Sequence, residues 1–464
     1  MGQAPVVPLA PARLRNLLGA APARFARHPE VLTVDLPLCG RRHSTYRDRG
    51  LISDVYNAFK LSHLERIHQL QFMTPERLDP RVLPYTHGFQ HTRWEHSVAA
   101  AWIMEELGQR LKLDEPLIKL AVILDLLHDH ALPPGGDATK NLYHQRGMMQ
   151  KVDEDAQFLH RFDRFKTPWL ALKDKYGLPD NSRELLGLGI KGVGILGEMH
   201  DVADTLSYLS LDTDAIARYR DEVDHAMYSK GLHQALELAD ESPGRNVIES
   251  ARLVLDQGRP RLVIDDVDGL MRMLELRFRM WYELYTAREH KYLEFLYIEL
   301  LGPELMRRGR LTVTRMRDRG DDWLHQEIAT VFGHTELLLR HQTIAAHGPE
   351  TLCFDRQEQV LEAERQAFET GAFTLLAHRR VQARTSNKTN KYFVQVGGEV
   401  LPFSQAVPER MRTLEEILQQ FKSRQPWGLY RTYPPFELPQ KLRETWLKAR
   451  ARWHTPSTTL PFTP

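Results

Sequence analysis

The sequence predicts a mostly α-helical protein with a smaller α+β region at its C-terminal end. Apolar residues recur at helical spacing from about residue 50 to residue 341. Within this stretch, residues 115–129 form a nearly all-apolar run that ends abruptly in His128-Asp129. Beyond about residue 373 the chain becomes rich in β-formers. With 464 residues, 42% of them hydrophobic, the chain can bury a substantial core.

The predicted elements divide the chain into three parts. Residues 1–49 are expected to form an N-terminal arm, Pro-rich at 4–11, with one short strand at Val31–Leu36. Residues 50–345 are expected to form a helical domain, with helices at 52–72, 93–111, 115–129, 152–165, 181–190, 198–219, 221–239, 245–256, 266–302 and 321–341. In the first of these helices, apolar residues recur in steps of three from Leu61 to Leu70 and therefore share one side.

Residues 346–464 are expected to form the α+β region. Turn residues 386–390 follow one β-rich run, 373–384, and precede another, 392–402, so a β-hairpin is predicted. A final helix is predicted at 408–423.

Composition restricts the environment and the partners. The net charge of +1 gives no argument for a nucleic-acid or membrane partner. Two distant cysteines, Cys39 and Cys353, have no zinc-finger spacing and fit a reducing, cytoplasmic environment. The chain contains no apolar run of about 20 residues, the length that a membrane span requires. Residues 1–29 contain no acidic residue, which leaves an organelle transit peptide open beside a simple arm.

Three short segments carry the residue types of a metal site. They are Arg93-Trp-Glu-His96-Ser97 at a helix start, His128-Asp129 at the end of the apolar helix, and the segment from Asp201 to Asp212. Imidazole and carboxylate groups suit divalent ions such as Mn, Fe, Zn, Ni or Mg. A buried, unpaired carboxylate is costly, and a cation offsets that cost. Each segment alone has a structural explanation, as a helix cap or a solvated face, and only the three together predict a metal site.

The ordered set resembles the H…HD…D pattern of the HD-domain metal-dependent phosphohydrolases. More narrowly, it resembles their deoxynucleoside triphosphate triphosphohydrolase (dGTPase-like) branch. The segment at Arg93 is similar to that branch's R-x-E-H-S, Arg66 to Leu70 is similar to R-x-x-x-Q-L, and Asp204 to Asp212 is similar to D-x-x-x-Y-x-x-x-D. The resemblance covers roughly residues 50–300.

This resemblance implies an HD-domain helical bundle that works as a homo-oligomer. The implied metal ligands are His96, His128, Asp129 and Asp204. It also implies that Arg93 and Tyr208 lie near substrate phosphate, and Gln69 and Leu70 near the deoxyribose.

Two departures from the family pattern affect how substrate would be handled. Family members follow HD with further histidines, whereas here the next histidine after His130 is His144, and Thr205 replaces the usual lysine after the last metal Asp. We therefore consider Asp137 and His144 as catalytic acids and Lys140 as a phosphate contact, although ordinary loop solvation explains them equally well. Asp201 is expected to orient a ligand histidine.

The predicted function is a metal-dependent phosphohydrolase acting on nucleotides, foremost as a dNTP triphosphohydrolase. The alternatives are a phosphatase or phosphodiesterase acting on other phosphoesters, and a non-catalytic HD protein that binds nucleotides or nucleic acid. Two basic patches could hold a regulatory nucleotide or nucleic acid, or could simply be solvated faces paired with acids. The first patch contains Arg307, Arg308, Arg310, Arg315, Arg317 and Arg319, and the second contains Arg379, Arg380, Arg384, Lys388 and Lys391.

Overall fold

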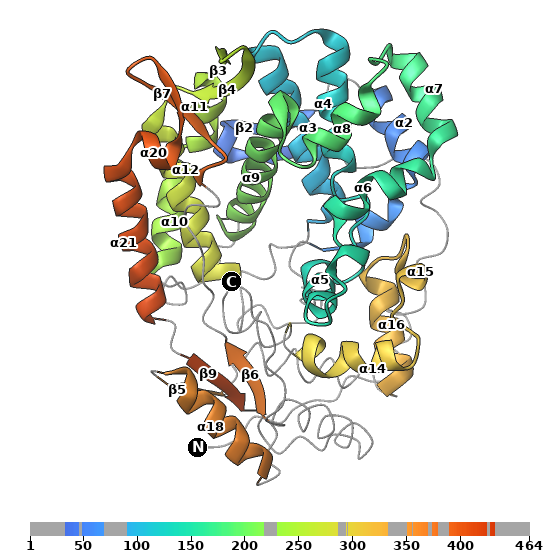
Figure 1. Ribbon diagram of the computed structural model, residues 1–464, viewed down its shortest axis with the longest axis vertical. Coiled ribbons are helices and arrows are strands. Elements are labelled where there is room, and N and C mark those ends of the chain that lie inside the picture. The colour runs from blue at the N-terminus through green and yellow to red at the C-terminus, as the bar shows by residue number, and fades with distance from the viewer. Residues whose placement is uncertain are drawn as a thin grey trace.

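The computed structural model describes residues 33–45, 49–68, 91–217, 230–285, 294, 296–332, 350–354, 356–369, 374–378, 389–424 and 427–431. The described chain is mostly helical with small sheets, which confirms the predicted fold class (Figure 1). Among these residues, no helix is both long enough and apolar enough to cross a bilayer.

Three helices form the centre of the molecule: α3 (Arg93–Arg110), α4 (Glu115–Leu127) and α9 (Gly194–Ala217). All three bury large apolar side chains in one core, as the periodicity predicts. Figure 1 shows two groups of helices flanking this centre. One group contains α2 (Arg49–Phe59), α6 (Glu154–Asp163), α7 (Lys166–Tyr176) and α8 (Ser182–Gly189), and the other contains α10 (Lys230–Asp240), α11 (Pro243–Ser250) and α12 (Val267–Met280).

Shorter helices complete the α-helical part. A second layer below the centre in Figure 1 contains α5 (Gly136–His144), α14 (Gly302–Arg307), α15 (Val313–Met316) and α16 (Asp321–Phe332). A π-helical turn, Trp281–Tyr285, continues α12, and another, Tyr297–Leu301, precedes α14. Single 3₁₀ turns lie at Pro37–Cys39 and Met149–Lys151.

A longer 3₁₀ helix, Leu61–Arg66, stands where one long α-helix over 52–72 was predicted. The steps of three in its apolar residues match the three residues per turn of this helix type. Gln69 and Leu70 lie outside the described residues.

The strands form three sheets. The predicted N-terminal strand is β1 (Thr33–Leu36), which pairs with β2 (Arg41–Thr45). A four-stranded sheet has the order β3 (Ala251–Asp256), β4 (Arg259–Ile264), β7 (Phe393–Val396) and β8 (Glu399–Pro402). A three-stranded sheet has the order β5 (Glu350–Phe354), β9 (Trp427–Arg431) and β6 (Thr374–His378), accompanied by α18 (Gln357–Glu369).

Two sequence predictions about strands are wrong. Residues 251–256 form β3 rather than the end of a helix, because Gln257 and Gly258 both have positive φ and close a tight hairpin to β4. Two strands therefore interrupt the region that was predicted to be helical. In addition, the two predicted C-terminal strands do not pair with each other: β6 pairs with β9, and β7 forms a hairpin with β8.

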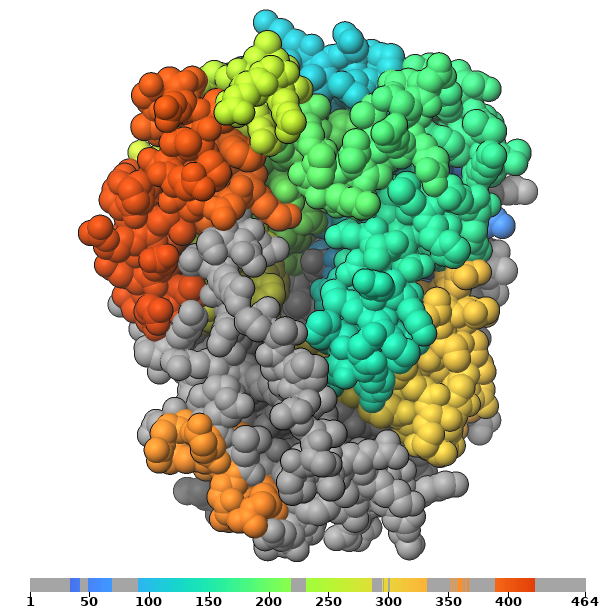
Figure 2. Space-filling model, in the orientation of Figure 1, coloured from blue at the N-terminus to red at the C-terminus, as the bar shows by residue number. Residues whose placement is uncertain are grey.

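The C-terminal region packs directly on the helical part. β7 pairs in parallel with β4, with Val263 opposite Phe393. After β8 come α20 (Phe403–Ala406) and the predicted final helix, α21 (Pro408–Arg424). In Figure 2 this orange-red segment forms a continuous surface with the yellow-green β3–β4 hairpin. This packing places Lys391 and Tyr392 against α9.

Candidate metal centre

Two helix ends bring the histidines together. Helix α3 begins with a capping box, in which Thr92 Oγ1 accepts from the Glu95 backbone N–H (3.3 Å) and Glu95 accepts from the Thr92 N–H (2.6 Å). This cap sets the first turn and places His96 inside the core. Helix α4 ends at Leu127, and the Pro133-Pro134-Gly135-Gly136 loop follows, with positive φ at both glycines. His128 and Asp129 therefore face α3 rather than continuing along α4.

The four predicted ligands meet in space. Nε2 of His96 lies 3.0 Å from Nε2 of His128. Asp129 Oδ2 lies 3.5 Å from the His128 Nε2 and 4.0 Å from the His96 Nε2. From α9, Asp204 Oδ1 lies 3.3 Å from the His96 Nε2 and 3.8 Å from the His128 Nε2. Donor atoms of His96, His128 and Asp129 all lie within 4.8 Å of one another.

The hydrogen bonds behind the two imidazoles determine their tautomers. Nδ1 of His128 lies 2.7 Å from the Asp125 carbonyl oxygen, which can only accept, so Nδ1 carries the proton. Nδ1 of His96 lies 3.0 Å from Ser207 Oγ, whose own hydrogen is donated to the Asp204 carbonyl. The His96 proton is therefore also on Nδ1. Burial lowers the pKa of His96, which keeps the ring neutral.

Two unprotonated Nε2 atoms thus face each other beside two carboxylates. Burial opposes ionisation of Asp129, but Arg93 and the other basic groups around it outweigh burial and hold the pKa of this carboxyl well below its usual range. Four lone-pair donors that converge with no hydrogen between them repel one another unless a cation lies among them. The donor set therefore fits a divalent metal ion.

A buried pair behind the ligands was missed by the sequence analysis. Asp125 is fully buried, and its Oδ1 accepts from Nδ1 of His200 at 2.6 Å. Burial opposes the charge on His200, but Asp125 outweighs it and raises the pKa of His200 to about 9. Asp125 also supplies the carbonyl that orients His128, so it holds a ligand in place. The sequence could have indicated this residue, because Asp125 is the one charged residue between Leu120 and Leu127.

Asp201, which was predicted to orient a ligand histidine, makes a different contact. Asp201 does not contact a ligand histidine; its Oδ1 accepts from Nζ of Lys391 in the C-terminal region. Next to Lys391, the buried hydroxyl of Tyr392 bonds Thr205 Oγ1 at 2.9 Å. Asp204 thus lies between two residues of α9 that the C-terminal region contacts.

A chain of alternating charges extends from Asp129. Arg93 is buried and its guanidinium lies 3.1 Å from Asp129 Oδ2 and 3.6 Å from Asp137 Oδ2. Lys140 then bridges Asp137 Oδ1 (2.6 Å) and Glu154 Oε1 (2.5 Å). The structure therefore brings the predicted residues Arg93, Asp137 and Lys140 together in one chain of charges that starts at Asp129.

Glu154 belongs to this chain and was not predicted. Burial raises the pKa of Glu154, Lys140 opposes the shift, and Asp129 and Asp137 add to it, so the pKa reaches about 7. Its second oxygen, Oε2, is buried and lacks a hydrogen-bond partner among the described residues. By contrast, His144 is exposed, and its Nδ1 lies 3.1 Å from Met149 Sδ rather than in this chain. No local pattern around Glu154 distinguishes it from an ordinary residue in the first turn of a helix.

The other face of the centre is lined by α9 and α12. Tyr208 lies one turn after Asp204 and packs against the Tyr285 ring, with Arg277 Cζ 5.8 Å from the Tyr208 ring centroid. Among the described residues, no carboxylate forms an ion pair with Arg277. Asp212, one turn further, accepts from the Tyr285 hydroxyl. The polar residues predicted for one face of α9 include Tyr208 and Asp212. The fold places Arg277 of α12 beside Tyr208.

Comparisons with known proteins identify the fold. Neither a family model nor a curated protein matches the sequence. A hypothetical protein from Aquifex aeolicus is 16% identical, with a TM-score of 0.54, over 91% of this chain and 99% of that one. A phosphohydrolase from Bacteroides thetaiotaomicron VPI-5482 is 14% identical, with a TM-score of 0.50, over 82% of this chain and 94% of that one. At such identities the likeness shows a shared fold.

Proposed function

We propose that this protein is a metal-dependent, HD-type phosphohydrolase that acts on nucleotides. The observation that carries the proposal is the convergence of His96, His128, Asp129 and Asp204 with both imidazole lone pairs directed inward. The fold shared with a phosphohydrolase supports it. A bound metal would supply charge neutralisation at phosphorus and lower the pKa of a water nucleophile.

The residues around the centre suit a phosphoester. Arg93, held by Asp129 and Asp137, presents a planar guanidinium beside the metal ligands. In α12, burial disfavours the charge of Arg277, but Tyr208 and nearby Asp204 raise its pKa, so the group stays charged. One guanidinium group beside Asp129 and another within electrostatic range of Asp204 would help to bind a phosphoryl group.

Glu154 suits the transfer of a proton to the leaving group. Its pKa of about 7 leaves a large fraction protonated near neutral pH, and the partnerless Oε2 can hold that proton. Lys140 fixes the other oxygen. In this proposal Glu154 is the catalytic acid, the role for which the sequence suggested Asp137 and His144.

For substrate, we propose a deoxynucleoside triphosphate, split into deoxynucleoside and triphosphate. The motif segments around Arg93 and Asp204 support this choice. One observation favours a second candidate, a phosphoester with fewer phosphates: Lys140 is already neutralised by Asp137, which leaves less positive charge for a triphosphate.

Metal analysis combined with a nucleotide panel tests the proposal. We expect purified wild-type protein to bind one of Mn, Fe, Zn, Ni or Mg and to release either triphosphate or orthophosphate. The double variant His128→Ala/Asp129→Ala should lose both the metal and the activity, whereas Asp180→Asn, at an exposed carboxylate of the α7–α8 loop, should keep both. Retention of activity by the double variant would refute the proposed centre.

A further inference from the structure

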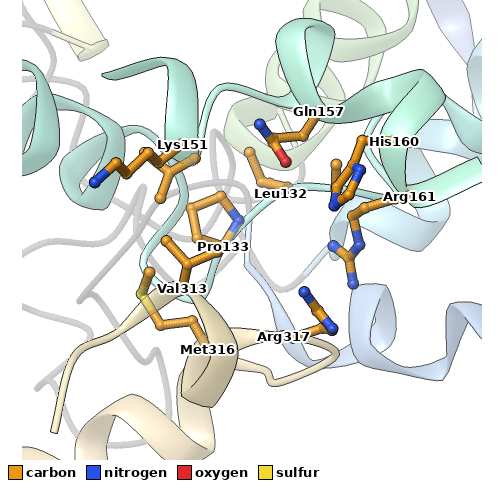
Figure 3. A pocket seen from close by; sticks show the side chains of 11 residues that line it. Leu132, Pro133, Lys151, Gln157, His160, Arg161, Val313, Met316 and Arg317 are labelled. Carbon is orange, nitrogen blue, oxygen red and sulfur yellow. The ribbon is translucent and has the colours of Figure 1, made fainter. Parts of the chain in front are cut away.

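A second pocket lies behind the loop that follows the metal ligands. This open pocket lies between that loop, α6 and α15. Its lining contains none of the four proposed metal ligands. Figure 3 shows Leu132 and Pro133 in the middle of the pocket, with Arg161 and Arg317 at one side and Lys151 at the other.

The lining of the pocket is positively charged. The eleven lining residues include three permanent cations, Lys151, Arg161 and Arg317, and no carboxylate. Arg161 is buried and donates to Asp318. Asp318 also lies 3.4 Å from Arg164, so one carboxylate serves two arginines. The Nε atom of Arg161 is buried and has no hydrogen-bond partner in the described part of the chain.

Arg317 differs from most arginines of its patch. Four of the six arginines between residues 307 and 319 pair with two acids: Arg307 and Arg308 with Glu304, and Arg310 and Arg315 with Glu327. These four arginines therefore belong to a solvated face paired with acids, which was one of the two explanations that the sequence left open for this patch. Arg317 has no such acid among the described residues, and Figure 3 shows it directed toward Arg161.

Two guanidinium groups directed at each other repel unless an anion lies between them. Burial lowers the pKa of Arg161, Asp318 opposes that shift, and the fields of Arg164 and Arg317 add to it, which places the Arg317 charge within interaction range of Arg161. The part of the pocket between these arginines and Lys151 is apolar and is lined by Leu132, Pro133, Val313 and Met316 (Figure 3). The pocket therefore combines an anion-binding side with a side that fits an organic group.

We propose that this pocket binds a phosphomonoester. Arg161 and Arg317 bind the phosphate, because a dianion with several acceptor oxygens matches two guanidinium forks. The apolar wall receives the organic part of the ligand. The pocket is separate from the metal centre, but its wall is connected to it, since the Leu132 N–H donates to the carbonyl of Asp129 at 2.8 Å.

Calorimetric titration of the full-length, EDTA-treated protein tests this site with two probes, inorganic phosphate and phenyl phosphate. Arg317→Gln should weaken phosphate binding about tenfold or more, as expected for a lost charge-assisted contact. The matched control is Arg319→Gln, which removes the same charge from an exposed arginine outside the lining and should change binding less than about twofold. Phenyl phosphate should bind more tightly than phosphate, because its ring covers apolar wall.

Several results would overturn the proposal. Equal losses in the two arginine variants would mean that only bulk charge matters, and unchanged binding in Arg317→Gln would exclude the pocket. If circular dichroism shows that Arg317→Gln is unfolded, Arg317→Lys, which keeps the charge but lacks the planar fork, must show the loss instead. Binding should persist in His128→Ala/Asp129→Ala, so failure of the metal centre and failure of this pocket are distinguishable.

Discussion

Replacing Asp125 by Asn tests whether the buried ion pair beside the proposed metal centre stabilises the fold. The Asp125 carboxylate is fully buried and accepts from His200 at 2.6 Å. In the folded protein it raises the pKa of His200 from 6.5 to about 9. A shift of this size corresponds to about 3 kcal/mol in the free energy of unfolding. Asp125→Asn keeps the shape and the carbonyl that orients His128, so the main loss should be this charge interaction.

The sign of the pH dependence follows from the raised pKa. The folded state binds the His200 proton more tightly than the unfolded state, so the stabilisation is fully present below pH 6.5. It declines as the pH rises through about 9. Asp125→Asn should therefore lower the free energy of unfolding by about 3 kcal/mol at pH 6, and by clearly less at pH 10.

Denaturant titration of EDTA-treated protein at both pH values measures this difference. EDTA is needed because a bound cation would change the charge balance around His200. Asp180→Asn removes an exposed carboxylate and should leave the unfolding midpoint unchanged at either pH. A loss of stability in Asp125→Asn that is equal at pH 6 and pH 10 would refute the ion-pair explanation.

Three further substitutions test the proton donor, the C-terminal contact and the packing of α9. Glu154→Gln should lower kcat about 100-fold and abolish the fall of wild-type activity as the pH rises through about 7, measured by product release across pH. Tyr392→Phe should weaken metal binding about tenfold, measured by Co²⁺ titration, because Thr205 beside Asp204 loses its 2.9 Å partner. Gly197→Ala should lower the free energy of unfolding by about 2 kcal/mol or more in denaturant titration, since a Cβ there would lie 2.4 Å from the Gly192 carbonyl carbon.

Each of these substitutions has a control and an outcome that would contradict it. A Glu154→Asp variant retains a proton donor and should keep the pH dependence; a wild-type-like rate in Glu154→Gln would remove this residue from the mechanism. Unchanged Co²⁺ affinity in Tyr392→Phe would show that the C-terminal contact does not position Asp204. Gly194→Ala, at an open position with φ of +73°, should cost less than Gly197→Ala, and the reverse order would contradict the steric argument.

The ligand types and most of the helices could be predicted from the sequence, because both depend on neighbouring residues. The apolar run before His128 determines a buried helix, and the Pro-Pro-Gly-Gly loop after it ends that helix. The segment that starts at Arg93 carries its own capping box, so the position of His96 in the first turn is also a local property.

Strand pairing was decided by tertiary structure. A β-rich run indicates a strand but does not specify its partner, since the partner is chosen by hydrogen bonds and side-chain packing across the sheet. β7 therefore pairs with β4, more than a hundred residues earlier, rather than with β6. That pairing brings Tyr392 to Thr205, a contact that no local pattern indicates.

The residues that give the centre its chemical character also came from tertiary structure. By itself, the sequence determined that two histidines and two aspartates stand at places suited to a metal. The fold decided that Asp125 pairs with His200, that Glu154 ends the charge chain from Arg93, and that Arg277 remains without an acid among the described residues. The physical reason is that burial and electrostatic fields depend on every group within a few ångströms, and those groups come from helices far apart in the chain.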